Sequence, residues 1–394
     1  MPIWGIFQRK VVPQRKDLEV RSLTPQGDEV AFSQETFGLA LLQQETAAAP
    51  KQNIFVSPLS IFLALCMTQN GAAGNTKAAI RKVLGLRTDA TDEALNQSAA
   101  KLFNSLQSSG DAELTIANAL WVDIRSTVAP DFVRVCQEVY AATAETLDLN
   151  HPSSVMVIND WVSEKTRGKI PEIVTPNGVA GLPAILTNAI FLKGAFCNPF
   201  PKEATQPKPF YLTDGREKIV PMMRLAGLGG SYRRGKRFEA AVLRYKGSGI
   251  ALYMLLPAKG IHPEQVLTEE CVQEMLLGRA RIELDLSIPR FALDFGNDLR
   301  ESLARLGMGI AFQMPGADFS ALGTPPFYIG GVFHKTRLEV DEQGTVAAAA
   351  TVVYDMWGFK SQESKTLVFD HPFAVLLRDT KSGAILFAGI VYEP

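Results

Sequence analysis

The sequence predicts an α+β protein, because its helix-like and strand-like segments fall into separate blocks. The first half is mainly helical and the second half mainly extended, without the strand and helix alternation of a doubly wound parallel sheet. No internal repeat is visible, and no Ser/Gly-rich linker divides the 394 residues. We therefore expect one domain in which helices pack on sheets.

A first buried helix is expected directly after Ser57. A serine there can accept a hydrogen bond from a backbone N–H at the helix start, and Pro58 suits the first helical position because an N–H there would be unpaired anyway. The residues that follow, LSIFLALCM, are too apolar for a surface helix.

A second helix is predicted over VMVINDWVSEKTRGK, with Ser154 as its N-cap. Val155, Ile158 and Val162 recur at helical spacing, so they should share the face that packs on the core. Gly168 is well placed to end this helix, since glycine readily adopts the left-handed conformation that often follows a helix.

The strands are predicted mainly in the second half, from β-branched and aromatic runs closed by Gly, Pro or charged turns. DTKSGAILF should connect the last two as a hairpin. The predicted strands are AILTNAIFL (184–192), GIALYMLLP (249–257), RIELDLSIPRFALDF (281–295), TRLEVDE (336–342), FAVLLRDT (373–380) and AILFAGIVYEP (384–394).

The composition excludes several classes of function. The chain is 46% hydrophobic and 21% charged, which suits a globular protein with a large core. Its formal net charge of -1 gives no electrostatic reason to expect nucleic acid or an anionic membrane as a partner. Apolar runs stay short of the roughly 18 residues that a membrane span needs.

The N-terminal stretch is locally basic through Arg9, Lys10, Arg15 and Lys16, but no apolar segment of signal-peptide length follows. We expect residues 1–24 to form a solvated tail. The sequence by itself indicates an intracellular protein, with secretion after removal of a signal peptide as the alternative.

The cysteines and histidines give no sign of a metal centre or of catalysis. The four cysteines lack metal-ligand spacing, so we expect free and mostly buried thiols, with no metal and no cofactor. HExxH, GxSxG, P-loop and GxGxxG motifs are absent, so nothing indicates an enzyme. His334 stands at a strand-like position and is expected to be structural. The residues are Cys66, Cys136, Cys197 and Cys271, and His151, His262, His334 and His371.

The segment DEQGTVAAAATVV makes neither a good helix nor a good strand on its own. Gly344 to Val353 are small or β-branched, and without a proline all of them can join a sheet. In a strand, Thr345, Ala347 and Ala349 fall on one face. These features suit a strand that slides into a packed sheet, and equally a plain alanine-rich edge strand or short helix.

This segment resembles the proximal hinge of the reactive-centre loop in serpins, whose pattern is E-E/K-G-T/S-x-A-A-A-A. Other stretches resemble serpin segments in serpin order, from about residue 25 to the C-terminus, and together they are more specific than one alanine run. They are NIFVSPLSIFLAL, NGAAGNTKAAIRKVLGL, INDWVSEKTRGKIPEIV, LTNAIFLKGAF, FYLTDGREKIVPMM, VFHKTRLEVDEQGT and DHPFAVLLRDTKSGAILFAGIV.

The resemblance implies one serpin domain over residues 25–394, with three β-sheets, eight or nine helices and an exposed reactive-centre loop at about 344–363. It implies that a serine protease attacks this loop, forms an acyl-enzyme and is trapped when the cut loop inserts into the central sheet. No cofactor is implied, and we expect a monomer. The alternative is a non-inhibitory serpin that acts as a carrier, chaperone or structural binding protein, whose hinge would contain bulky, charged or proline residues.

The resemblance also implies roles for single residues. Serpins have a polar cluster under the central sheet, the shutter, a helix that crosses that sheet, and a charge pair at the top of the insertion site, the breach. The shutter residues are Ser57, Ser60, Asn188 and His334, the crossing helix contains Asn159 and Trp161, and the breach pair is Arg290 and Glu342. The hinge residues are Glu342, Gly344, Thr345, Ala347, Ala348, Ala349 and Ala350.

Two positions depart from the family pattern. Phe196 stands in LKGAF where serpins usually have a breach tryptophan, and Val346 follows the hinge threonine where glutamate is frequent. Neither residue blocks insertion on steric grounds.

The scissile bond is expected between Trp357 and Lys360. The usual loop length counted from Glu342 gives Gly358-Phe359, whereas counting back from Pro372 gives Phe359-Lys360. Trp357 and Phe359 suit a chymotrypsin-like specificity pocket and Lys360 a trypsin-like one, and we favour a chymotrypsin-like target.

Overall fold

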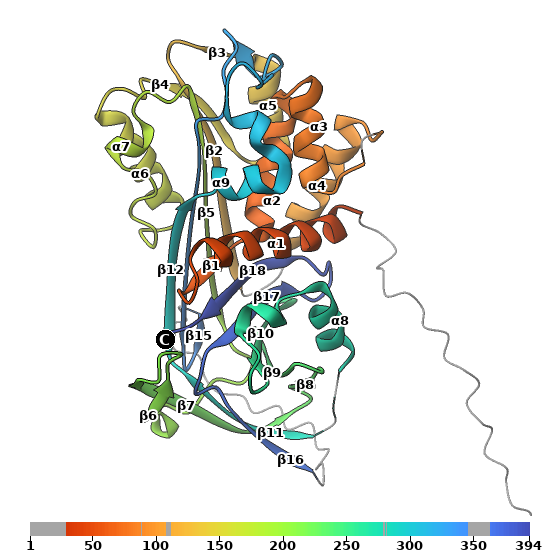
Figure 1. The fold of residues 1–394 in the computed structure, drawn as a ribbon, viewed down its shortest axis with the longest axis vertical. Coiled ribbons are helices and arrows are strands. Elements are labelled where there is room, and N and C mark those ends of the chain that lie inside the picture. The colour runs from red at the N-terminus through yellow and green to blue at the C-terminus, as the bar shows by residue number, and fades with distance from the viewer. Residues whose placement is uncertain (1–28, 88, 108–111, 279, 281, 346–362) are drawn as a thin grey trace, which may run out of the picture.

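The computed structural model describes residues 29–87, 89–107, 112–278, 280, 282–345 and 363–394. Its largest sheet runs along the long axis of the molecule (Figure 1). Helices α6 (Ser153–Lys165) and α7 (Pro176–Val179) lie on one side of this sheet, and a cluster of helices that includes α2 (Pro58–Thr68) lies on the other.

The central sheet has six strands, two pairs of which are parallel. In spatial order the strands are β12 (Phe291–Asp298), β14 (Gly331–Asp341), β15 (Gly344–Thr345), β5 (Ala184–Ala195), β2 (Glu113–Asp123) and β4 (Thr143–Leu147). β14 runs parallel to β5, and β2 runs parallel to β4.

Two further large sheets and a small strand pair complete the β structure. The second sheet has the order β1 (Ile54–Val56), β18 (Ile385–Val391), β17 (Phe373–Asp379), β10 (Ile250–Pro257), β9 (Phe238–Arg244) and β8 (Tyr232–Arg234). The third has the order β16 (Ser364–Val368), β11 (Glu283–Pro289), β7 (Glu217–Gly229) and β6 (Gln206–Tyr211). β3 (Thr127–Val128) pairs with β13 (Gly323–Thr324).

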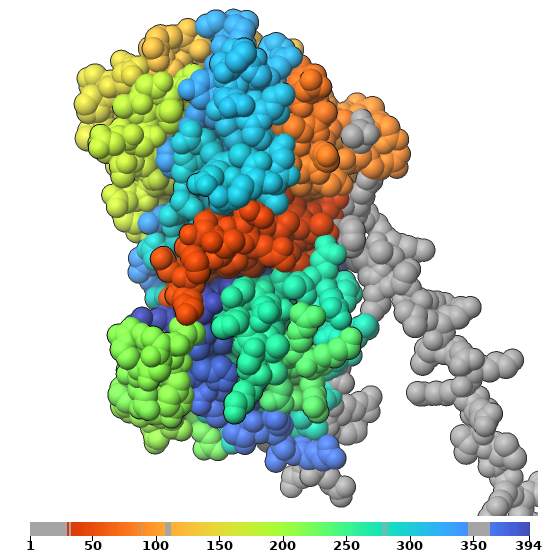
Figure 2. Space-filling model, in the orientation of Figure 1, coloured from red at the N-terminus to blue at the C-terminus, as the bar shows by residue number. Residues whose placement is uncertain are grey.

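The described residues form nine α-helices, two of them a single turn long. α1 (Glu29–Ala48) lies across the middle of the face in Figure 2, between the helical part and the part richer in strands. The remaining helices are α3 (Gly74–Val83), α4 (Asp92–Gln107), α5 (Pro130–Tyr140), α8 (Glu269–Leu277) and α9 (Arg300–Leu303), with short turns at Gln69–Gly71, Lys202–Ala204, Pro263–Val266, Ala304–Met308 and Gly309–Phe312.

The α+β prediction and the strands predicted in the second half are confirmed, but the prediction was incomplete: β6, β7, β8, β9, β13 and β16 of that half were not predicted. Two further differences concern single segments. The run 281–295 forms two strands in different sheets, β11 and β12, which meet at Arg290. β2, an 11-residue strand in the half expected to be mainly helical, was not predicted. Its residues from Ala117 on are all buried, without alternation, so a period of two is weak there.

The expected start of α2 is confirmed, whereas that of α6 is wrong. The Ser57 hydroxyl accepts a hydrogen bond from the Ser60 N–H, and every residue of α2 is buried. Ser154 instead lies inside α6, where its hydroxyl donates to the Asp148 carbonyl. Pro152 already has helical dihedral angles, so the helix begins one residue before Ser154. Gly168 takes a positive φ in the turn after α6.

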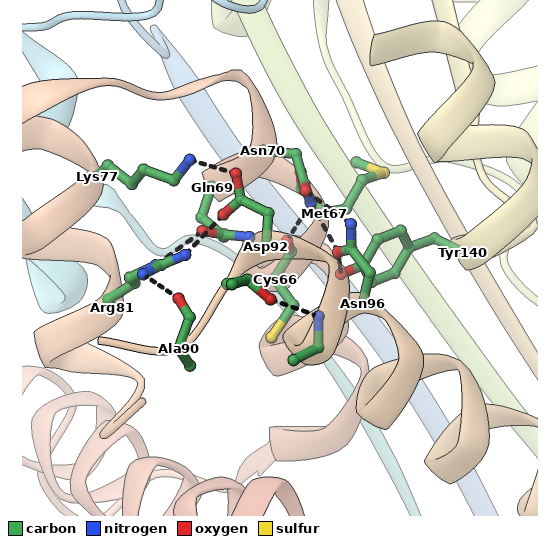
Figure 3. Close-up of polar contacts among 12 residues, drawn as sticks. Cys66, Met67, Gln69, Asn70, Lys77, Arg81, Ala90, Asp92, Asn96 and Tyr140 are labelled. Atoms are coloured by element: carbon green, nitrogen blue, oxygen red, sulfur yellow. Dashed lines mark hydrogen bonds and ion pairs between the residues drawn. The ribbon is translucent and has the colours of Figure 1, made fainter. Parts of the chain in front are cut away.

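A polar network ties the helices beneath the sheet together (Figure 3). The Arg81 guanidinium on α3 donates to the Gln69 side chain, 3.1 Å away, and to Asp92 at the start of α4, 2.6 Å away. Burial by itself would raise the pKa of Asp92, but Lys77 and Arg81 outweigh it and lower that pKa. Since its members pair mainly with one another, we interpret the network as structural.

Close packing between α1 and α2 predicts the effect of a substitution at Gly38. A Cβ atom at Gly38 would lie 2.3 Å from Cβ of Pro58, which is far inside van der Waals contact. Helix propensity alone would make Gly38→Ala stabilising by up to about 1 kcal/mol. We expect it instead to lower the free energy of unfolding by about 1–3 kcal/mol in urea titrations, because α1 must move away from α2. Gly229→Ala is the control, since its Cβ would meet no atom within 4 Å.

Candidate functional site

The candidate site is a line down the central sheet where β14 and β5 pair directly, below the level at which β15 lies between them. From Gly331 to Arg337, β14 pairs directly with residues 185–191 of β5, in parallel. Above that level, β15 lies between them and pairs antiparallel with both: Thr345 is opposite Val340 on one side and Gly194 on the other. We call the direct pairing of 331–337 with 185–191 the seam. The sheet is thus closed along the seam and already parted above it.

The structure places the four predicted shutter residues around the seam. His334 and Asn188 are register partners across it, and their Nδ1 and Oδ1 atoms are 2.5 Å apart. The Ser60 hydroxyl donates to the same Asn188 oxygen at 2.7 Å, and the Ser57 N–H donates to His334 Nε2 at 3.1 Å. The cluster therefore joins β14, β5 and the start of α2.

Asn118 on β2 belongs to the same cluster, although sequence reasoning missed it. The Asn188 amide donates a hydrogen bond to Asn118 Oδ1, and the two residues are register partners. Asparagine inside an apolar strand was the one available signal in ELTIANALWVD, and β2 itself was not predicted.

The hydrogen bonds fix the tautomer of His334. Asn188 Oδ1 can only accept, so Nδ1 of the imidazole carries the proton and Nε2 accepts from Ser57. Burial lowers the pKa of His334 to about 3, so the ring is neutral at physiological pH. A neutral ring is what this two-sided bonding requires.

The predicted breach pair is formed, at the level where the chain turns from β14 into β15. Arg290 Nη2 lies 2.6 Å from Glu342 Oε1, and the Thr205 hydroxyl donates to the same oxygen at 2.8 Å. Burial by itself would raise the pKa of Glu342, but hydrogen bonds from Arg290 and Thr205 outweigh it and lower that pKa. Thr205 had not been predicted.

Phe196 lies in an aromatic cluster beside this pair. Its ring centre is 5.1 Å from that of Tyr245 and 6.3 Å from that of Phe200. The N–H of Phe196 donates to the Gln343 carbonyl, and the N–H of Phe200 donates to the Glu342 carbonyl. Backbone hydrogen bonds therefore hold Glu342 and Gln343, at the start of the hinge, to the segment that follows β5.

The hinge enters the sheet through a narrow passage at Gly344. Its φ of +141° suits glycine, and a Cβ atom there would lie 2.3 Å from the Gly194 carbonyl oxygen. Thr345 follows with no exposed surface, and its hydroxyl oxygen is 2.5 Å from that of Tyr245.

Asn159 and Trp161 lie on α6, away from the shutter cluster. The Asn159 side chain binds the backbone of residues 173 and 174, and the Trp161 ring packs edge-on against Trp121 of β2 at 5.5 Å. These contacts hold α6 and the segment after it against the outer face of the sheet.

Several predicted residues fall outside the described residues. They are the hinge alanines Ala347, Ala348, Ala349 and Ala350, Val346, which departs from the family pattern, and the candidate cleavage residues Trp357, Gly358, Phe359 and Lys360.

In the parts that are described, no cluster of three or more His, Cys, Asp or Glu side chains could hold a metal ion. No described helix is both long and apolar enough to span a membrane. None of the four cysteines forms a disulfide, and all but Cys197 are buried, as predicted.

Comparison with known proteins gives one consistent family. Residues 32–394 match the family model described as "Serpin (serine protease inhibitor)". The chain is similar to Serpin B6 of Macaca fascicularis, at 32% identity over 93% of this chain and 100% of that protein. It is similar to the leukocyte elastase inhibitor of Homo sapiens, at 31% identity over 93% and 100%. It also superimposes on the structure of human thyroxine-binding globulin, with a TM-score of 0.83, 25% identity and coverage of 93% and 98%.

The depressed pKa of His334 predicts a pH-dependent contribution to stability. Between about pH 6.5 and pH 3 the unfolded chain binds a proton at this histidine and the folded chain does not, so stability falls as the pH falls. The slope from this one group approaches about 1.4 kcal/mol per pH unit. Urea unfolding at pH 7.5, 6.5 and 5.5 should show a shallower decline for His334→Gln than for the wild type. Parallel profiles would contradict a buried neutral His334.

Proposed function

Because this chain belongs to the serpin family, we propose that it is an irreversible suicide-substrate inhibitor of serine proteases. In this proposal residues 25–394 form one inhibitory domain with residues 344–363 as its reactive-centre loop. The target's nucleophile attacks the loop and forms an acyl-enzyme. The cut loop then inserts between β14 and β5 before water hydrolyses the ester. The observation that carries the proposal is β15, a strand of hinge residues that lies between these two strands where they part.

Strand direction makes the insertion favourable. β14 and β5 are parallel to each other, and β15 is antiparallel to both. Insertion therefore replaces one parallel pairing by two antiparallel ones, which are slightly more stable per residue. Each added ladder hydrogen bond contributes about 0.5–1.5 kcal/mol, so a dozen release on the order of 10 kcal/mol.

The register of β15 explains why the hinge is built of small residues. Thr345 lies opposite Val340 and Gly194, so continuing the antiparallel pairing by two residues brings residue 347 opposite 338 and 192. Leu338 and Leu192 are fully buried. Alanine at 347 adds little volume between them, whereas a bulky or charged side chain would have to displace the packed core.

The same register brings Thr351 to the shutter. Six residues beyond Thr345, position 351 comes opposite 334 on β14 and 188 on β5. Insertion must break the bond between His334 and Asn188, which crosses the seam. A threonine hydroxyl arriving between them offers both a donor and an acceptor in its place.

The loop is long enough to move a trapped enzyme across the domain. Gly344 to Gly358 comprise 15 residues, which span roughly 50 Å as an extended strand. Trp357 and Phe359 at the expected cleavage region favour a chymotrypsin-like target, and a monomer suffices for the mechanism. The name of one relative, the leukocyte elastase inhibitor, supports protease inhibition in general.

Incubation with chymotrypsin tests the function and the specificity. We expect a covalent complex that survives SDS, and mass spectrometry of the released peptide should place the cut between Trp357 and Lys360. Cleavage by chymotrypsin without a complex would contradict this target.

Heating intact and loop-cleaved protein tests insertion separately: the cleaved form should unfold at a higher temperature. A cleaved form that gains no stability would favour a carrier or structural role; thyroxine-binding globulin, a structural neighbour, was solved in complex with thyroxine.

Hinge substitutions should convert the inhibitor into a substrate. Thr345→Arg places a long cation where the native side chain is fully buried, and Ala347→Pro removes a ladder donor and fixes φ. Both should slow insertion, so gel analysis with chymotrypsin should show mostly cleaved protein and little covalent complex. Thr345→Ser is the matched control and should still form the complex. Undiminished complex formation by Thr345→Arg or Ala347→Pro would refute the insertion mechanism.

A further inference from the structure

Tyr245 lies at the entrance of the hinge into the central sheet and is held there by its own backbone. It follows β9 directly, its side chain is fully buried, and it forms an isolated β-bridge with Phe196. Its N–H donates to the Ile250 carbonyl, and the neighbouring Cys197 and Lys246 N–H groups bond the Arg244 and Ala195 carbonyls. Backbone hydrogen bonds therefore join the end of β5 to the end of β9 on either side of the Tyr245 ring.

A glycine on β5 makes room for the Tyr245 ring. A Cβ atom at Gly194 would lie 2.8 Å from Cδ1 of that ring, so any side chain at 194 would displace it. Gly194 is also the residue of β5 directly opposite Thr345. The space left by this glycine thus lets the ring reach across β5 to Thr345.

The hydroxyl of Tyr245 meets the hydroxyl of Thr345 in that space. Their oxygens are 2.5 Å apart, and Thr345 is fully buried. Burial raises the pKa of the phenol, so it stays protonated and can donate. If Thr345 left the sheet, the phenol would lose this partner in a place that water does not reach, which is unfavourable.

We propose that Tyr245 is a positioning residue, which keeps Gly344 and Thr345 seated between β14 and β5 before cleavage and so sets the register in which the loop inserts. The inference rests on the proposed inhibitory function and deepens it. The hydrogen bond between the two hydroxyl groups holds Thr345 opposite Val340 and Gly194. The residues that follow Thr345 then pair in the same register.

Amide hydrogen exchange in the uncleaved protein tests this role without any protease. Tyr245→Phe and Thr345→Val each remove one hydroxyl with little change of shape. Each should raise the exchange rate of the peptide over residues 341–345 about fivefold, because the hinge leaves the sheet more often. The double variant should exchange no faster than either single variant, because both remove the same bond. Thr345→Ser keeps a hydroxyl and should retain wild-type exchange.

Other outcomes would overturn the proposal. One such outcome is wild-type exchange at residues 341–345 in Tyr245→Phe. Another is a double variant whose exchange rate rises by the product of the two single effects, because independent effects indicate altered packing and not one shared hydrogen bond. A loss of protection in Thr345→Ser equal to that in Thr345→Val would also contradict it.

Titration against chymotrypsin separates the two hypotheses. Tyr245→Phe should raise the number of inhibitor molecules consumed per trapped protease about fivefold, since fewer loops start in register. An unchanged number would contradict the role of Tyr245 in insertion. If the wild type forms no covalent complex with any protease while the exchange results hold, the inhibitory function fails and the seating of the hinge by Tyr245 stands.

Discussion

The geometry of the central sheet is governed by the direct pairing of β14 with β5. Because these strands are parallel, a strand that enters between them can be antiparallel to both, and β15 already is. The native sheet therefore keeps a less favourable pairing where two better ones are available. Below β15 the sheet is closed, so in the proposed mechanism this difference in pairing energy is released only when the seam opens and the loop enters.

Buried polar groups hold the seam closed in one register. His334, Asn188, Ser57 and Ser60 join both strands to α2, and the bonds between them are directional, so a slip of one residue would leave several groups unpaired. At the upper end, Glu342 with Arg290 and Thr345 with Tyr245 hold the segment that leads into β15. Directional hydrogen bonds therefore define one register along the seam and at β15.

Much of the architecture follows from local sequence patterns, and the failures have physical causes. α2 and the apolar strands β10, β17 and β18 were predictable because their signals, a capping serine and continuous β-branched runs, act over a few residues. The start of α6 was missed because Pro152 continues the helix backwards past Ser154. β2 was missed because it is buried along most of its length and lacks the alternation that marks a half-exposed strand.

The chemistry of the hinge follows from the amino-acid order alone: residues from Gly344 on are small and free of proline, Glu342 precedes them, and motifs in serpin order run along the chain. Four of the five polar residues at the seam were also predictable in this way. The folded chain was needed to show that Asn118 completes them, that Gly194 opens a space for Tyr245, and that Tyr245 meets Thr345. These contacts join residues 50 to 100 positions apart through distances and angles, which no local pattern of apolar and polar residues encodes.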